Sequence, residues 1–137
     1  MEVKDVMNRK VIALEHWNTA QEAAKLMKKH RIGSVIIKKG NRAVGIVTER
    51  DLIEKVVASA RDPSKVKLDC IMSYPLITVS PYLNIREASK KMKEHKIKRL
   101  PVVESGRLVG ILTTFDILKT IPQLYSEVVK VWVEPVS

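Results

Sequence analysis

The chain has 137 residues, of which 45% are hydrophobic and 29% charged, and its formal net charge is +10. This length suits one compact domain with a substantial core and excludes two large independent domains. No apolar run approaches the roughly 20 residues of a membrane helix, and a single cysteine, Cys70, excludes an internal disulfide and a thiolate metal cluster.

The N-terminus, residues 1–5, is mixed in charge and shows no apolar signal segment. Together with the single cysteine, this predicts a cytoplasmic protein with no membrane partner. Cys70 lies in a short apolar run and is expected to be buried. The excess of Lys and Arg predicts an anionic partner, such as phosphates, nucleic acid or an acidic protein, or else a solvated lysine-rich surface.

The sequence contains an internal repeat. Residues 7–47 match residues 72–112 without a gap, so that Met7 falls on Met72 and Gly45 falls on Gly110, 65 positions further on. An ungapped match of this length indicates duplication of one structural unit. Two copies are expected to pack about a pseudo-twofold axis, and anything built at their junction should occur twice.

The first copy predicts the order strand, helix, strand, strand, helix. The strands are expected over 11–14, 35–37 and 43–47, with a glycine turn at residues 40–41. Thr19 and Glu22 predict a capping box at the start of a helix that ends near His30. A second helix is expected to begin at Thr48 and to carry an apolar stripe, Leu52, Ile53, Val56 and Val57.

The second copy predicts the same order. Strands are expected over 76–79, 100–103 and 108–112, with a turn at residues 105–106. Asn84 is the expected N-cap of the first helix, with Glu87 as its reciprocal acid, and Thr113 begins the second helix. The expected boundaries are repeat 1 over 1–60, a polar linker over 61–67, repeat 2 over 68–121 and a C-terminal tail over 122–137, in which 128–133 is strand-like.

Each copy ends its last strand with Thr-x-x-Asp, as Thr48–Asp51 and Thr113–Asp116. This spacing is also an ordinary capping box, which needs no ligand. The recurrence of the motif after a Gly-apolar-apolar strand end favours a binding role. A carboxylate there can accept from two adjacent hydroxyls, such as those of a ribose, and the Thr hydroxyl and the first N–H groups of the helix can serve the ribose or a phosphate.

Residues 3–121 resemble a tandem pair of cystathionine-β-synthase-type (CBS) domains, also called a Bateman module. The matching pieces are the duplicated unit, the 100–103 strand and the two Gly-apolar-apolar-Thr-x-x-Asp segments. The resemblance implies an α+β fold of two β-α-β-β-α repeats with pseudo-twofold symmetry and two clefts at their junction. It implies a regulatory module without catalysis, which binds AMP, ADP or ATP, or alternatively S-adenosylmethionine or NAD. It also implies a homodimer that signals to a separate, unidentified protein or through self-assembly.

Carried over to this sequence, the resemblance implies clefts that take residues from both copies. In the first cleft, Thr48 and Asp51 hold the ribose, Arg99 reaches phosphate, and the adenine is flanked by Ile77, Thr78 and Pro101. In the second, Thr113 and Asp116 hold the ribose, and the residues around the base are Ile12, Ala13, Ser34 and Ile36. The second cleft departs more from the family pattern unless Lys98 and Arg50 supply its positive charge, so equal affinities are not expected.

Two other functions fit the sequence. The basic charge fits nucleic-acid binding, although aromatic residues are few and neither zinc-ligand spacing nor a recognition helix is evident. A ligand-free assembly subunit, in which Thr-x-x-Asp acts only as a cap, is the other. An enzyme is not expected, because the sequence shows no nucleophile–base pair, metal cluster, Walker-type loop or paired catalytic carboxylates. No catalytic residue or metal ligand is therefore assigned.

Overall fold

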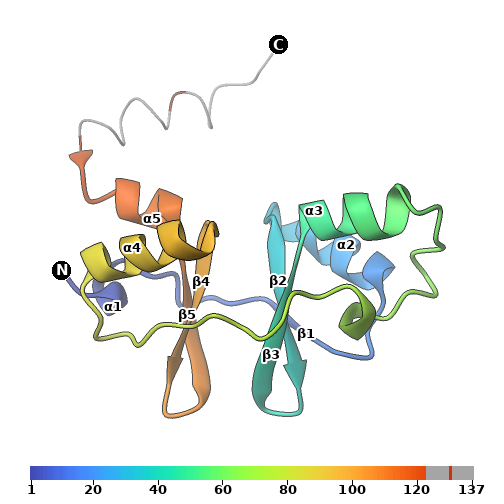
Figure 1. Cartoon of the computed structure of the whole chain (residues 1–137), viewed down its shortest axis with the longest axis horizontal. Coiled ribbons are helices and arrows are strands. Elements are labelled where there is room, and N and C mark those ends of the chain that lie inside the picture. Colours follow the sequence, from blue (N-terminus) through green and yellow to red (C-terminus); the bar gives the residue numbers. More distant parts are fainter. Residues whose placement is uncertain (123–129, 131–137) are drawn as a thin grey trace. The chain divides into compact units, whose positions relative to one another are not determined.

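The computed structural model describes residues 1–122 and 130 and shows an α+β fold (Figure 1). Its elements are α1 (Val3–Val6), β1 (Ala13–Glu15), α2 (Ala20–His30), β2 (Ser34–Lys39), β3 (Arg42–Thr48), α3 (Glu49–Leu52), α4 (Ile85–His95), β4 (Arg99–Glu104), β5 (Arg107–Thr113) and α5 (Thr114–Leu118). A π-helical turn, Ile53–Val57, continues α3, and a 3₁₀ turn covers Leu68–Cys70. The predicted order of elements is confirmed for the first repeat, and for the second repeat from its first helix onward. The strand expected over 128–133 lies outside the described residues, Lys130 excepted.

The chain forms two compact units. The first unit contains Val11–Ile77 and Ser105–Leu108; the second contains Met1–Lys10, Thr78–Glu104 and, among the described residues, those from Val109 to Pro122. Each repeat therefore places its leading segment with the other repeat. The N-terminal segment joins the elements of the second repeat, and the segment before Thr78 stays with those of the first.

The first unit is built on the sheet β1-β2-β3, in which β1 is parallel and β3 antiparallel to β2. Along this sheet Ser34 lies opposite Thr48, and Ala13 lies opposite Ile36. One side of α2 closes the core, because its apolar residues recur with the helical period. The buried core cluster is Ala20, Ala23, Met27, Val35, Ile37, Val47, Val56, Val66, Leu68 and Ile71.

The second unit is built on the hairpin β4-β5. The strand predicted over 76–79 is wrong in extent, because only Val79 pairs, in a parallel bridge with Val102. Pro75 and Pro81 flank this stretch, and proline has no N–H to donate to a strand ladder. The buried apolar residues of this unit include Val3, Met7, Val79, Ala88, Met92, Leu100, Val102 and Leu112.

Two expectations about helix starts have different outcomes. The capping box of α2 is confirmed, since the Thr19 hydroxyl accepts from the Glu22 N–H and the Glu22 carboxylate accepts from the Thr19 N–H. Asn84 does cap α4, but it accepts from the N–H of Arg86 at 2.8 Å. The reciprocal role predicted for Glu87 is wrong, because its carboxylate pairs with Lys90 at 3.3 Å.

Two expectations about burial need correction. Cys70 is exposed, because the 3₁₀ turn buries the neighbouring Leu68 and turns the cysteine outward. The stripe on the second helix is only half covered: Val56 is buried, whereas Ile53 and Val57 are 60% and 73% exposed. These two residues are one helical turn apart, so they form an apolar face on the surface of the first unit.

Candidate functional site

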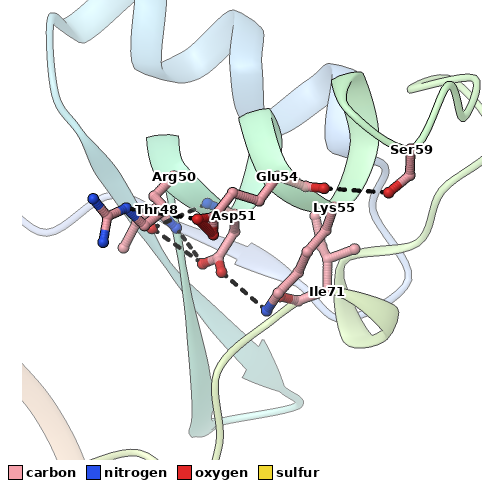
Figure 2. A network of polar contacts seen from close by, with 7 residues as sticks. All are labelled: Thr48, Arg50, Asp51, Glu54, Lys55, Ser59 and Ile71. Atoms are coloured by element: carbon pink, nitrogen blue, oxygen red, sulfur yellow. Dashed lines mark hydrogen bonds and ion pairs between the residues drawn. The ribbon is translucent and has the colours of Figure 1, made fainter.

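The Thr48–Asp51 motif lies where β3 passes into α3, and its two residues hydrogen-bond to each other (Figure 2). Asp51 Oδ2 accepts from the Thr48 N–H at 2.8 Å and from the Thr48 hydroxyl at 3.2 Å. The Asp51 N–H in turn donates to Thr48 Oγ1 at 3.3 Å. Asp51 is only 7% exposed, so the capping box fixes a nearly buried carboxylate at the end of the sheet.

The second copy of the motif forms the same two hydrogen bonds from backbone N–H groups between β5 and α5. Asp116 Oδ2 accepts from the Thr113 N–H at 2.8 Å, and the Asp116 N–H donates to Thr113 Oγ1 at 3.2 Å. Asp116 is 6% exposed. The capping role weighed in the sequence analysis is thus present in both copies, and a ligand role has to coexist with it.

Each aspartate also holds a lysine that sequence reasoning did not single out. Asp51 Oδ1 pairs with Lys55 Nζ at 3.0 Å, and Asp116 Oδ1 pairs with Lys119 Nζ at 3.3 Å. The two lysines are not equivalent in the repeat, because one is four and the other three residues beyond its acid. Both spacings place side chains on one helix face, and that spacing was the available signal.

The acceptor capacity of the two carboxylates differs. An ionised carboxylate offers about four acceptor positions. Asp51 receives the Thr48 N–H, the Thr48 hydroxyl and Lys55, whereas the described contacts of Asp116 are the Thr113 N–H and Lys119. A vicinal diol donates two hydrogen bonds. Asp116 can accept both hydrogen bonds of the diol in addition to its described contacts. Asp51 can accept both only after the Thr48 hydroxyl has rotated away from it.

The first unit brings together several other residues predicted for binding. The Ile36 N–H donates to the Ile12 carbonyl at 3.1 Å, and Ser34 pairs with Thr48 across β2 and β3. Ile36 is 1% exposed and Ser34 8%, so the first is a core residue and the second is nearly covered. Ala13 is partly buried, and Ile77 is the last residue of the segment Val11–Ile77 in this unit. Arg50 is largely exposed and lies 4.0 Å from Glu54.

The remaining predicted residues belong to the second unit. Pro101 is fully buried and accepts from the Val79 N–H at 3.0 Å, while the Thr78 carbonyl accepts from Lys91 at 2.7 Å. Lys98 is exposed, and its carbonyl accepts from the Thr114 N–H. Arg99 begins β4 and is partly buried. The predicted grouping of these residues with those of the other repeat stays a prediction.

Neither a metal site nor a membrane span is found in the part of the chain that the structure describes. No group of three or more His, Cys, Asp and Glu side chains among residues 1–122 and 130 is placed to hold a metal ion. Among the same residues, every helix is too short or too polar to cross a bilayer.

Comparison with known proteins identifies the family. The model of the CBS domain matches twice, over residues 3–58 and 66–123. The uncharacterized protein MK0525 of Methanopyrus kandleri is 42% identical over 128 residues, which are 92% of this chain and 65% of that protein. The chain thus spans just under two thirds of that relative's length.

Solved structures agree with this match. The CBS domain pair of protein MJ0100, determined with 5′-methylthioadenosine and S-adenosyl-L-methionine, superimposes with a TM-score of 0.78 at 32% identity, covering 90% of this chain and 97% of that one. The hexameric CBS-CP12 protein from bloom-forming cyanobacteria gives 0.78 at 30% identity, covering 86% of this chain and 69% of that one. The duplicated fold, the paired Thr-x-x-Asp motifs and the family match lead to one conclusion: this chain belongs to the CBS-domain family and is a tandem CBS pair.

Proposed function

We propose that this chain is a regulatory module that binds an adenosine nucleotide of the AMP, ADP or ATP type through Asp51 and Asp116. The observation that carries the proposal is the duplicated, nearly buried carboxylate, held in one orientation by its own helix cap and retaining acceptor capacity. The presence of two adenosine compounds in the structure of the related MJ0100 pair supports the adenosine class.

The proposed mechanism is linkage. A nucleotide that contacts both repeats and binds one relative arrangement of them more tightly than others stabilises that arrangement by mass action. A partner protein that distinguishes the liganded arrangement then responds to the nucleotide concentration. In this proposal the module acts in the cytoplasm and signals to a separate protein or through self-assembly.

The direct test is a thermal-shift series on the parent chain and on Asp51→Asn, Asp116→Asn and the double variant. Hydrogen bonds to a charged group contribute about 1.5–3 kcal/mol each. Each single variant is therefore expected to weaken AMP binding at its own site by roughly ten- to a hundredfold, and the double variant should lose almost all AMP-induced stabilisation. Unchanged AMP binding by the double variant contradicts the assignment.

The chain offers a matched control for the loss of a cap. Glu22 occupies the same capping-box position at α2 that Asp51 occupies at α3, and it is not assigned to the site. Glu22→Gln should lower the melting temperature without changing the shift that AMP adds. Short RNA at two salt concentrations completes the panel, because phosphate contacts with RNA weaken steeply as salt rises.

The choice of sugar gives a second, independent readout. 2′-Deoxy-AMP has the same base and phosphate but lacks one of the two hydroxyls. If the carboxylates hold the diol, it should bind about tenfold or more weakly than AMP, since one charged hydrogen bond is lost. Equal affinities would place the ribose away from both aspartates.

We also propose that the module self-associates through the apolar face formed by Ile53 and Val57. These side chains are 60% and 73% exposed on one side of the α3 extension. Burying them against a second copy removes apolar surface from water. The hexameric relative shows that a CBS-containing protein of similar fold can assemble from several copies.

A further inference from the structure

We propose that Lys55 couples occupation of the Asp51 site to the segment Leu68–Ser73 at the start of the second repeat, called the strap below. We also infer that the second repeat has no equivalent coupling among its described residues. This inference deepens the proposed function and rests on nucleotide binding at Asp51. It concerns which part of the chain responds to the ligand.

The coupling begins with a shared cation (Figure 2). Lys55 Nζ lies 3.0 Å from Asp51 Oδ1 and donates to the carbonyl of Ile71 at 2.9 Å. Asp51 is 7% exposed and Ile71 1%, so one ammonium joins a nearly buried carboxylate to a backbone carbonyl of the core. Loss of Lys55 would remove the hydrogen bond to the covered Ile71 carbonyl, which is costly, and would leave Asp51 with its Thr48 contacts alone.

The strap also contacts β3 and the core of the first unit. Ser73 and Ile46 exchange two backbone hydrogen bonds, of 2.9 Å and 3.2 Å, which joins the strap to β3. Leu68 is fully buried in the core of the first unit, and Met72 packs against Gly45. Because β3 leads directly into the Thr48 cap, Asp51, Lys55, the strap and β3 form a closed loop of contacts.

The corresponding residues of the second repeat make different contacts. The counterpart of Lys55 is Thr120, whose hydroxyl donates to the Ile117 carbonyl at 2.7 Å. Lys119 reaches Asp116 from a different helical position and lies 5.4 Å from the centroid of the Phe115 ring. Within residues 1–122 and 130, Lys119 makes no hydrogen bond to Val3–Asn8, the repeat counterpart of the strap. Among the described residues, therefore, no lysine links the carboxylate of the second repeat to its leading segment.

A diol bound to Asp51 stabilises the arrangement in which this carboxylate contacts Thr48 and Lys55 as described above. Through Lys55, the same arrangement includes the Ile71 carbonyl and the strap. Where the strap opens only after the ligand has dissociated, the ligand lowers the population of the open strap. At a ligand concentration of 100 times the Kd, the population falls about a hundredfold. The second repeat, in which the described contacts include no such link, should show no comparable effect at Val3–Asn8.

Amide hydrogen exchange tests this with an internal control. The Ile46 and Ser73 amides report on the strap, and the equivalent pair Ile111 and Asn8 reports on the second repeat through two bonds of 2.9 Å. In an Asp116→Asn background, saturating AMP should slow exchange at Ile46 and Ser73 by tenfold or more. Lys55→Met should abolish this slowing while AMP still shifts the Thr48 and Asp51 resonances, and Lys55→Arg should preserve part of it.

The outcomes separate the coupling from the proposed function. Without ligand, Lys55→Met should already speed exchange at Ile46 and Ser73, whereas Lys119→Met should leave Asn8 and Ile111 unchanged. Absence of AMP binding in the parent chain overturns the proposed function, and this ligand-free comparison still tests the contact network. If the Lys55→Met variant binds AMP and AMP slows amide exchange at Ile46 and Ser73 as much as in the parent chain, the proposed coupling through Lys55 is wrong.

Discussion

The sulfur of Met72 lies directly over Gly45, so close that a Cβ on this glycine would lie 2.6 Å from it. Gly110 and Met7 repeat the relationship in the second unit, with 2.7 Å between the corresponding positions. In each case the methionine comes from one sequence repeat and the glycine from the other. These contacts attach the exchanged leading segments to the strands β3 and β5.

Gly45→Ala is therefore expected to destabilise the first unit. The added methyl group meets Met72 Sδ at 2.6 Å and the Ser73 carbonyl at 3.0 Å, and only the methionine is flexible. Overpacking of this kind costs about 1–3 kcal/mol, measured as a lower midpoint in urea unfolding. Adding Met72→Ala should recover part of the loss. A Gly45→Ala chain as stable as the parent would show that the strap does not press on β3.

Glu22 predicts a specific pH dependence. The Thr19 N–H hydrogen bond, with further bonds from the Thr19 hydroxyl and Asn18, holds the pKa of Glu22 below its ordinary value of 4.5. A carboxyl whose pKa is lower in the folded state contributes stability above its unfolded pKa and loses it as pH falls through the folded pKa. The difference in unfolding free energy between the parent and Glu22→Gln should be constant above about pH 5 and shrink below about pH 4.5. A difference independent of pH would contradict the capping contact.

The apolar face of Ile53 and Val57 predicts self-association. Replacing both with Lys should weaken assembly about tenfold or more, because two apolar side chains lose their burial and two charges take their place. Sedimentation velocity measures the change. Trp17 and Tyr74, 58% and 72% exposed in the same unit, provide a matched double replacement with Lys that should leave assembly unchanged. A monomeric parent chain would remove the basis of this proposal.

The two carboxylates predict unequal sites for a ligand without phosphate. Adenosine presents the diol alone, and Asp116 can accept it beside its described contacts, while Asp51 must first release the Thr48 hydroxyl. Adenosine should therefore bind more tightly to the Asp51→Asn variant, which keeps the Asp116 site, than to Asp116→Asn. Calorimetric titration of both variants gives the comparison, and the reverse order would refute the acceptor count.

Features encoded within a few residues were predictable from the sequence. The Thr19–Glu22 box, the glycine turns and the two Thr-x-x-Asp caps each depend on contacts three or four positions apart, so their residue types indicate the local structure. The duplication also predicted the order of the elements, apart from the strand over 76–79. Asn84 shows the limit, because its cap formed while the acid predicted to reciprocate paired with Lys90 instead.

The tertiary structure decided what depends on distant segments. Only the folded chain shows that Met72 packs on Gly45 and that Lys55 joins Asp51 to the Ile71 carbonyl. A gap-free repeat cannot reveal the exchange of leading segments, because both segments carry apolar residues and a methionine at matching positions, Val3 and Met7 or Leu68 and Met72, so either pairing would bury similar apolar groups. The sequence by itself thus determined the duplicated unit and its capped acids, whereas long-range packing decided which repeat each leading segment joins and which backbone carbonyl shares the lysine.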